Sequence, residues 1–350
     1  MRVGVVSEGL RDSLVLRSRR FPRPLFDVMG AMMLSRALMA GVHFGLFDRL
    51  AASPRSAQQL ARETGCDQHG MELLLDALVC CDYLEEENGR YRNTRLADRW
   101  LRDDSPHTLA NFVRFNYDQW EWVSQVEQFI QEGAAQDIHQ KLAAPQWRRY
   151  LLGLRDIAAL SADEIVSKVP FTVSPQSLLD IGAGHCFYAI ALCQRYPGLR
   201  VTVVDLEQAA RIGRDHVKQA GFEARFEFRL GAVTETPLGE DHDAAFLFNV
   251  MHHLDEESNR ATLRRLYGAL APGGQVVVSE VFREEGQKRP QDQLGGLLAL
   301  FFGITSKREA YSFGQIAGWA RAAGFGRIRR RALRTAPHAS LLLAAKEARA

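Results

Sequence analysis

The second half of the chain alternates short apolar runs with helical patterns. The runs that predict strands cover residues 177–181, 200–205, 225–230, 243–249, 275–281, 326–334 and 339–346. Helical spacing separates the first five, which predicts a parallel sheet built from βα units. No long helical pattern separates the last two, so we expect an antiparallel pair at the sheet edge. Pro272-Gly273-Gly274 is expected to turn the chain into the fifth strand.

The first half is dominated by helical spacing. Residues 26–50 repeat apolar positions at helical intervals, and Gly41 and Gly45 are expected to break that helix. The pattern then predicts a helix over 56–65 with Ser56 as its N-cap, a helix over 67–81, and a hairpin over 83–94 that turns at Asn88-Gly89. This order of helix, helix and hairpin is that of a winged helix.

Winged helices commonly bind DNA, but the charge of this one argues against that use. Its second helix carries Asp67, Glu72 and Asp76 and has no lysine or arginine between residues 67 and 78. A helix that faces phosphates is normally basic. We therefore expect no nucleic-acid binding, and we expect this region to pack against a partner subunit.

Residues 107–166 have the pattern of long helices rich in aromatic side chains. Most of these side chains are expected to fill the helix core and a minority to line a pocket for an aromatic or greasy substrate: Phe112, Phe115, Tyr117, Trp120, Trp122, Phe129, Trp147 and Tyr150. The chain is thus expected to form a helical and winged-helix domain over 1–105, linking helices over 106–170, and an α/β domain over 171–350.

Composition and charge narrow the class of protein. The 350 residues are 46% hydrophobic and 25% charged, and the net charge of +2 gives no general attraction to nucleic acid or anionic membranes. The five cysteines contain no CxxC pair and are interpreted as reduced thiols of a cytoplasmic protein. The longest apolar run, 294–304, is too short to cross a bilayer, and the N-terminus lacks the apolar core of a secretory signal.

The candidate chemistry begins where the first strand of the predicted sheet ends. Residues 177–186 read Ser-Leu-Leu-Asp-Ile-Gly-Ala-Gly-His-Cys, and Gly182 and Gly184 allow the backbone to pass close to a ligand. The next strand ends in Asp205, whose carboxylate is placed to accept hydrogen bonds from ribose hydroxyls. Because no third small residue completes the G-x-G-x-x-G pattern, a nucleoside without a pyrophosphate fits this turn better than NAD.

Five segments, taken in order, resemble the O-methyltransferases of small-molecule metabolism, of the plant caffeate and bacterial antibiotic-tailoring type. They are 179–184 (LDIGAG), 204–206 (VDL), 249–257 (NVMHHLDEE), 278–280 (VSE) and 323–325 (AGF). The resemblance runs from about residue 25 to the end of the chain. It implies an α/β fold with a Rossmann-like, seven-stranded class I methyltransferase sheet, S-adenosyl-L-methionine as cofactor, and a homodimer held by the N-terminal winged-helix dimerisation domain.

The resemblance also assigns roles to single residues. His252 takes the position of the catalytic base and Glu280 that of the carboxylate that orients it, and adjacent parallel strands would bring the two together. His253 replaces an acid of the family and is expected to lie behind the base or at the surface. Asp180 either anchors the glycine turn or contacts the methionine amino group through water. The cofactor-binding positions are Asp180, Gly182, Gly184, Asp205, Leu206, Ala232, Val233 and Asn249.

Three positions depart from the usual pattern of the family. Cys186 stands where a further glycine is usual, so the next helix is expected to enter slightly differently against the cofactor. Ala232 stands where an acid often lies near the adenine, which leaves adenine recognition to backbone groups or other side chains. A second catalytic carboxylate of many members falls on Ala310, and Glu309 substitutes for it only by a one-residue shift.

We therefore expect an S-adenosylmethionine-dependent O-methyltransferase that acts on a hydroxyl of a small aromatic or polyketide-like secondary metabolite. The missing second carboxylate keeps open C- or N-methylation, or a reaction in which the cofactor is only bound. A non-enzymatic regulator that uses its winged helix is the third hypothesis, and the acidic helix argues against it. No metal is expected, because adjacent histidines on an irregular turn rarely converge on one ion.

Overall fold

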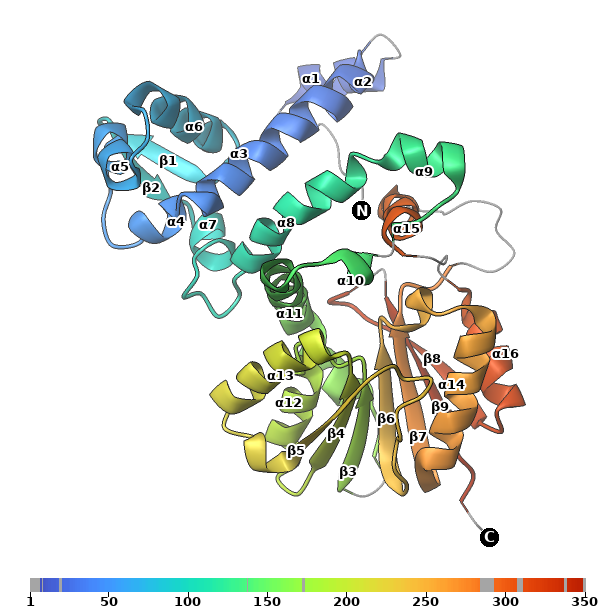
Figure 1. Ribbon diagram of the computed structural model, residues 1–350. Helices are drawn as coiled ribbons and strands as arrows, with labels where there is room; N and C mark the ends of the chain where they lie inside the picture. Colours follow the sequence, from blue (N-terminus) through green and yellow to red (C-terminus); the bar gives the residue numbers. More distant parts are fainter. Residues whose placement is uncertain are drawn as a thin grey trace. The chain divides into compact units, whose positions relative to one another are not determined.

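The computed structural model describes residues 7, 9–18, 21–136, 138–171, 174–283, 293–306, 311–336 and 339–348. The chain divides into two compact units, residues 1–117 and 118–350. The first unit contains α1 (Leu10–Arg17), α2 (Arg23–Leu25), η1 (Phe26–Gly30), α3 (Ala31–His43), α4 (Leu46–Arg49), α5 (Ala57–Thr64), α6 (Gln68–Cys80), β1 (Leu84–Glu87), β2 (Arg90–Asn93) and α7 (Arg95–Trp100) (Figure 1).

The first unit forms the predicted order of helix, helix and hairpin. Ser56 caps α5 by accepting a hydrogen bond from the Gln59 N–H, and the Gln59 side chain accepts one from the Ser56 N–H, which completes a capping box. The hairpin of β1 and β2 turns at Asn88 and Gly89, with φ of +54° and +74°. Positive φ at both turn residues matches the right-handed twist of the strands. The winged-helix prediction is therefore confirmed.

The prediction that Gly41 breaks its helix is wrong. α3 runs through Gly41 to His43, and the break falls at Gly45, whose φ is +63°. A Cβ at Gly41 would lie 3.0 Å from the Phe47 ring and 3.2 Å from Leu78. The glycine is needed for close packing of α3 against its neighbours, a tertiary constraint that the local sequence does not reveal.

The helical stretch Arg23–His43, made of α2, η1 and α3, has an exposed apolar surface. By length and composition alone it could cross a membrane, and 17% of its apolar window is buried. A single helix of this kind is weak evidence for a membrane span. Its exposed apolar side chains are Leu25, Phe26, Val28, Met29, Met32, Met33 and Leu34, called here the N-terminal apolar face. An apolar surface of this kind usually marks a site of association.

The second unit contains a seven-stranded mixed sheet. Its helices are the end of α8 (Ala110–Val123), α9 (Val126–Glu132), α10 (Ile138–Lys141), α11 (Ala144–Lys168), α12 (Phe187–Arg195), α13 (Glu207–Gln219), η2 (Glu223–Arg225), η3 (Met251–His253), α14 (Glu256–Ala269), α15 (Gln293–Thr305) and α16 (Phe313–Ala322). Its strands are β3 (Ser177–Ile181), β4 (Arg200–Asp205), β5 (Phe226–Leu230), β6 (His242–Phe248), β7 (Leu270–Glu280), β8 (Gly326–Ala332) and β9 (Ser340–Ala345).

The sheet has the order β5-β4-β3-β6-β7-β9-β8. The strands β3 to β7 pair with one another in parallel, as predicted. β8 and β9 form the antiparallel edge, which was also predicted. The prediction that Pro272-Gly273-Gly274 turns the chain into the fifth strand is wrong, because β7 already begins at Leu270. Leu270 pairs with His242 before a register shift, so the Pro-Gly-Gly segment lies within an irregular part of the strand.

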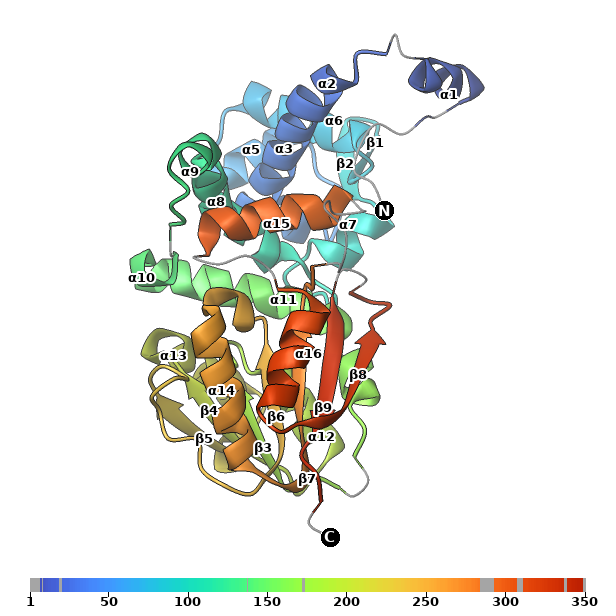
Figure 2. The ribbon, with the colours of Figure 1, turned by 90° about the vertical axis from the view of Figure 1, so that its right-hand side faces the viewer.

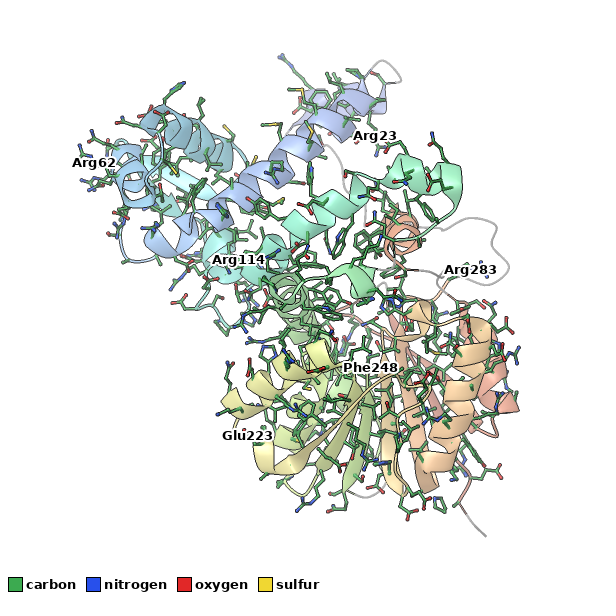
Figure 3. The ribbon with its side chains drawn as sticks, viewed as in Figure 1. Arg23, Arg62, Arg114, Glu223, Phe248 and Arg283 are labelled. Carbon is green, nitrogen blue, oxygen red and sulfur yellow. The ribbon has the colours of Figure 1, made fainter. Side chains whose placement is uncertain are left out.

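Helices cover both faces of this sheet. α14 and α16 lie in front of it in Figure 2, and their apolar residues share one core with alternate residues of the strands, among them Leu179, Leu247 and Val278. α11, α12 and α13 share the other core with the intervening strand residues, among them Leu178 and Phe246. Phe248, which ends β6 and is labelled in Figure 3, belongs to this second core. The parallel strands therefore end together at one edge, the usual ligand-binding edge of such sheets.

Candidate active site

The turn after β3 is shaped by three residues with left-handed backbone. Gly182, Gly184 and Cys186 have φ of +62°, +52° and +56°. A Cβ at Gly182 would lie 2.5 Å from the Val250 side chain, and one at Gly184 would lie 3.0 Å from Leu151. Both glycines are therefore required by conformation and by space. Cys186 adopts the same backbone region without being glycine, at the N-cap of α12.

The side chain of Cys186 fits against a second glycine. A Cβ at Gly213, on α13, would lie 2.8 Å from the Cys186 Sγ and 2.8 Å from the Gly184 carbonyl oxygen. Gly213 thus leaves room for both the thiol and the turn. Burial raises the pKa of the Cys186 thiol well above its usual value. This side chain is a packing group, because a buried, protonated thiol is a poor nucleophile.

Asp205 ties the end of β4 to the glycine turn. Its carboxylate accepts hydrogen bonds from the Gly184 N–H and the Leu206 N–H, each at 2.7 Å. Burial raises the pKa of Asp205 to about 6, although these two donors oppose that shift. Each carboxylate oxygen keeps a further acceptor position for a hydroxyl. Leu206 itself is 40% exposed at the start of α13.

Asp180 is a second buried carboxyl beside Asp205. It is the fourth residue of β3 and 4% exposed. Burial raises the pKa of Asp180 well above its usual value, and the nearby charge of Asp205 adds to the shift. Within the described part of the chain, its side chain has no hydrogen-bond partner. A buried carboxyl in this state is ready to bind a donor group of a ligand.

The loop that follows β5 folds back tightly on itself. The Gly231 N–H donates to the Asp205 carbonyl oxygen at 2.9 Å, and the Ala232 carbonyl accepts from the Thr236 N–H at 3.0 Å. Gly231 has a φ of +140°, and a Cβ there would collide with the Thr236 hydroxyl. Ala232 is exposed and Val233 half-buried. The loop places backbone groups, and no carboxylate, at the position expected to face the adenine.

Arg265 of α14 hydrogen-bonds to the backbone of this loop. Its guanidinium donates to the Val233 carbonyl oxygen and, at 2.5 Å, to the Thr236 carbonyl oxygen. Two hydrogen bonds from one planar cation fix the loop more firmly than a single neutral donor would. The sequence offered no signal for this residue, because an arginine within a helix is most often a solvated surface group.

The predicted pairing of His252 with Glu280 is present. His252 lies on η3, just after β6, and Glu280 ends the neighbouring β7. The His252 Nδ1 lies 2.9 Å from the Glu280 Oε2, and the Met251 N–H donates to the Glu280 Oε1 at 2.9 Å. Both side chains are buried. An ionised carboxylate only accepts, so His252 carries its proton on Nδ1 and presents a free lone pair on Nε2.

The end of β6 brings η3 to this position. Asn249 has a φ of +53°, and its N–H donates to the Ser279 carbonyl oxygen at 2.8 Å. Asparagine tolerates this left-handed conformation better than most residues. The Asn249 side chain is exposed at the same edge of the sheet as the glycine turn. Val250 follows and packs against Gly182, which links the candidate base to the candidate cofactor site.

His253 contacts other aromatic side chains beside the candidate base. Its ring centroid lies 4.0 Å from that of His252 and 4.4 Å from that of His139, which belongs to α10. The Ser306 hydroxyl lies 3.2 Å from the His253 Nδ1, and the Tyr150 hydroxyl 3.1 Å from the His139 Nε2. Burial, followed by the neighbouring His252 and His139, holds the pKa of His253 well below its usual value. Of the two positions expected for His253, behind the base or at the surface, this half-buried side chain takes the first.

An aromatic side chain of α15 also packs against His252. The Phe302 ring lies 4.7 Å from the His252 ring, with an angle of 31° between their planes. Phe302 belongs to α15, where a Cβ at Gly303 would lie 3.0 Å from the Phe129 ring. The sequence did not mark His139, Ser306 or Phe302, because each comes from a segment far from the motif in the chain. Ala310 and Glu309 lie outside the described residues.

The residues at this edge fit S-adenosylmethionine. Gly182 leaves a space that a Cβ would fill, Asp205 offers acceptor positions for ribose hydroxyls, and Asp180 is a buried carboxyl without a described partner. Among the described residues, no group of three or more His, Cys, Asp and Glu side chains could hold a metal ion. The site thus has the groups for a nucleoside and a separate candidate base.

Comparison with known proteins identifies two domains in the chain. Residues 108–326 match an O-methyltransferase domain and residues 26–103 an O-methyltransferase dimerisation domain. The chain is 26% identical, over 315 residues, to the 3-hydroxy-5-methyl-1-naphthoate 3-O-methyltransferase of Streptomyces sahachiroi, covering 88% of this chain and 90% of that protein. It is 26% identical over 283 residues to the N,N-dimethyltransferase OxyT of Streptomyces rimosus, covering 78% and 82%.

The fold is also that of solved relatives. Human N-acetylserotonin methyltransferase in complex with S-adenosylmethionine superposes with a TM-score of 0.81 at 23% identity, over 95% of this chain and 99% of that one. At this identity the likeness shows the fold alone, whereas the two domain matches span most of the sequence. The chain therefore belongs to the O-methyltransferase family and is an S-adenosylmethionine-dependent methyltransferase with a class I methyltransferase fold.

Proposed function

We propose that this enzyme methylates a hydroxyl group of a small aromatic or polyketide-like metabolite, with His252 as general base and Glu280 as the group that orients it. The observation that carries the proposal is the buried hydrogen bond between the His252 Nδ1 and the Glu280 Oε2. A hydroxyl is a poor nucleophile until it loses its proton, so an imidazole with a free Nε2 supplies what the reaction needs.

The chemistry divides between the cofactor and the chain. When bound, S-adenosylmethionine supplies a methyl group activated by the positive sulfonium. The task of the chain is to hold the acceptor oxygen in line with that methyl group and to take its proton on the His252 Nε2. Positioning of this kind supplies a large part of the rate enhancement in two-substrate reactions.

Aromatic side chains around the base support an aromatic acceptor. Phe302 packs on the His252 ring, and Phe129 packs at Gly303 of the same helix. Flat apolar surfaces favour stacking with a planar acceptor. A relative that acts on a naphthoate, according to its name, points to the same substrate class.

A second candidate function is N-methylation. The similarity to OxyT, which is named an N,N-dimethyltransferase, favours this alternative. An amine acceptor needs a base less than a hydroxyl does, because its neutral form is already nucleophilic. Dependence of the rate on His252 therefore separates the two reactions.

The test is a methyl-transfer assay with labelled S-adenosylmethionine and matched hydroxyl, amine and activated-carbon acceptors. We expect label on oxygen, and a loss of about 10²–10⁴-fold in turnover for His252→Ala, with binding of S-adenosylhomocysteine retained. His69→Ala, which removes an exposed histidine of α6, is the control. O-Methylation at the wild-type rate in His252→Ala would show that the base is assigned wrongly.

We also propose a cytoplasmic homodimer. The matched dimerisation domain covers residues 26–103, and the N-terminal apolar face supplies a surface that a second copy would cover. The five cysteines are free thiols, which suits a reducing compartment.

A further inference from the structure

His253 lies beside the candidate base, and its contact with Ser306 bears on its tautomer. Its Nδ1 lies 3.2 Å from the hydroxyl of Ser306, a residue that is 4% exposed. Among the described residues, the His253 Nδ1 is the one hydrogen-bond acceptor within reach of that hydroxyl. A buried hydroxyl donates its proton where an acceptor is available. We therefore assign the His253 Nδ1 as the acceptor, which places the proton of the neutral ring on Nε2.

The two neighbouring rings then present opposite hydrogen-bonding groups. Glu280 holds the proton of His252 on Nδ1, which leaves its Nε2 as an acceptor. Ser306 holds the proton of His253 on Nε2, which makes that atom a donor. The ring centroids are 4.0 Å apart, a distance shorter than a two-ring aromatic molecule.

His139 keeps the His253 ring in this place. The two rings meet edge to face, with centroids 4.4 Å apart and an angle of 82°. The Tyr150 hydroxyl contacts the His139 Nε2, and Trp147 packs beside the same ring with centroids 5.4 Å apart. Side chains from α10 and α11 thus support the donor that follows β6.

We propose that His253 is a specificity-determining residue that donates a hydrogen bond to a carbonyl oxygen next to the hydroxyl that is methylated. The preferred acceptor is then an aromatic compound with a hydroxyl and a carbonyl on adjacent positions, a class that includes ortho-hydroxyaryl ketones. This inference rests on the proposed function, because it takes His252 as the group that contacts the hydroxyl. An acid at position 253 would only accept, and would favour a neighbouring hydroxyl over a carbonyl.

The experiment measures binding, so it does not depend on methyl transfer. Three probes bind in turn to the complex of the enzyme with S-adenosylhomocysteine: 1-hydroxy-2-acetonaphthone, 1-naphthol and 1,2-dihydroxynaphthalene. For the wild type we expect the ketone to bind about tenfold more tightly than 1-naphthol, the size expected for one well-placed hydrogen bond. We expect His253→Asp to lose that preference and to favour the diol. His253→Gln, whose amide still donates, is expected to keep it.

Further variants separate specificity from damage to the fold. Ser306→Ala leaves His253 in place but removes the group that fixes its proton, so the preference for the ketone is expected to shrink. Thr305→Val is the matched control, since its hydroxyl donates to the Phe301 carbonyl oxygen at 2.9 Å. Equal affinity of the wild type for the ketone and 1-naphthol, or failure of all three probes to bind, overturns the inference. Methylation on nitrogen or carbon would instead overturn the proposed function.

Discussion

Glu280 fixes two features of the candidate active site with one carboxylate. One oxygen accepts from the Met251 N–H and thereby holds η3, and the other accepts from the His252 Nδ1 and thereby sets its tautomer. Both side chains are buried, so water does not compete for the hydrogen bonds that they make. The position of the histidine and the chemistry of the histidine thus depend on the same side chain.

Glu280→Gln should separate these two effects. The backbone N–H of Met251 can only donate, so the amide oxygen is expected to stay there and the amide NH₂ to face the His252 Nδ1. Nδ1 then has to accept, the proton moves to Nε2, and the base is lost while the ring stays in place. We expect turnover to fall by about 10³–10⁴-fold, with the Kd for S-adenosylhomocysteine changed by less than about twofold. Steady-state kinetics and calorimetry check this, and near-normal turnover would contradict the proposed role of Glu280.

Asp205 should make cofactor binding dependent on pH. Its pKa is raised to about 6 by burial, while ribose hydroxyls bind best to the ionised carboxylate. Affinity for S-adenosylhomocysteine is therefore expected to be full above pH 6 and to fall below it, by up to about tenfold per pH unit. Calorimetry across this range should detect proton release on binding. Asp205→Asn should bind more weakly and lose this pH dependence, whereas an unchanged pH profile in the variant would rule Asp205 out as its source.

The same pKa shift makes the stability of the cofactor-free protein depend on pH in the opposite direction to cofactor affinity. A carboxyl whose pKa is higher in the folded state than its ordinary value of 3.8 binds protons more tightly when folded. This group therefore stabilises the fold at low pH, and its contribution is lost as the pH rises from about 4 to about 6. Cofactor-free protein should lose some thermal stability across this interval, and Asp205→Asn should lose less.

At the scale of elements, one helix side chain organises the loop that is expected to face the adenine. Arg265 of α14 joins the Val233 and Thr236 carbonyls across a loop that also hydrogen-bonds to the Asp205 backbone. The loop carries Ala232 and Val233, so any recognition of the adenine by this loop would depend on backbone groups held in place. The loop, Asp205 and α14 form one connected unit.

Arg265→Met should loosen that unit. Two carbonyl groups lose a charged donor, so we expect a loss of about 1–3 kcal/mol in the free energy of unfolding and about tenfold weaker binding of S-adenosylhomocysteine. Arg264→Met is the matched control, because this neighbour on α14 is exposed. Chemical unfolding and calorimetry measure the two effects. Equal behaviour of the two variants would show that the loop does not depend on Arg265.

The sequence predicted those features whose cause is local. The strands, the hairpin turn at Asn88-Gly89 and the cap at Ser56 follow from short patterns. The His252–Glu280 pair was expected from the family resemblance, together with the meeting of two adjacent strand ends. Features that depend on distant packing were missed. Gly41 allows close packing against Phe47 and Leu78. His139, which lies on a four-residue helix, contacts the His253 ring. No pattern within a short window carries such information.

At the scale of the molecule, the N-terminal apolar face is the feature that most needs a partner. Val28, Met29 and Met33 are 69%, 59% and 56% exposed on a helical stretch long enough to cross a membrane. Water makes such a surface costly, at about 25 cal/mol for each Å² left uncovered. A second copy of the chain and a lipid bilayer are the two surroundings that would cover it, and the matched dimerisation domain, which begins at residue 26, favours the second copy.

Charges placed on this face should therefore break the dimer. We expect the wild type to be dimeric at micromolar concentration, and Met29→Glu with Met33→Glu to be monomeric, because each carboxylate would have to be buried without a partner. Arg62→Glu on α5, labelled in Figure 3, also adds a carboxylate but on an exposed site away from this helix, and should stay dimeric. Light scattering after size-exclusion chromatography gives the mass of each. A monomeric wild type that sediments with lipid vesicles would instead assign this face to a membrane.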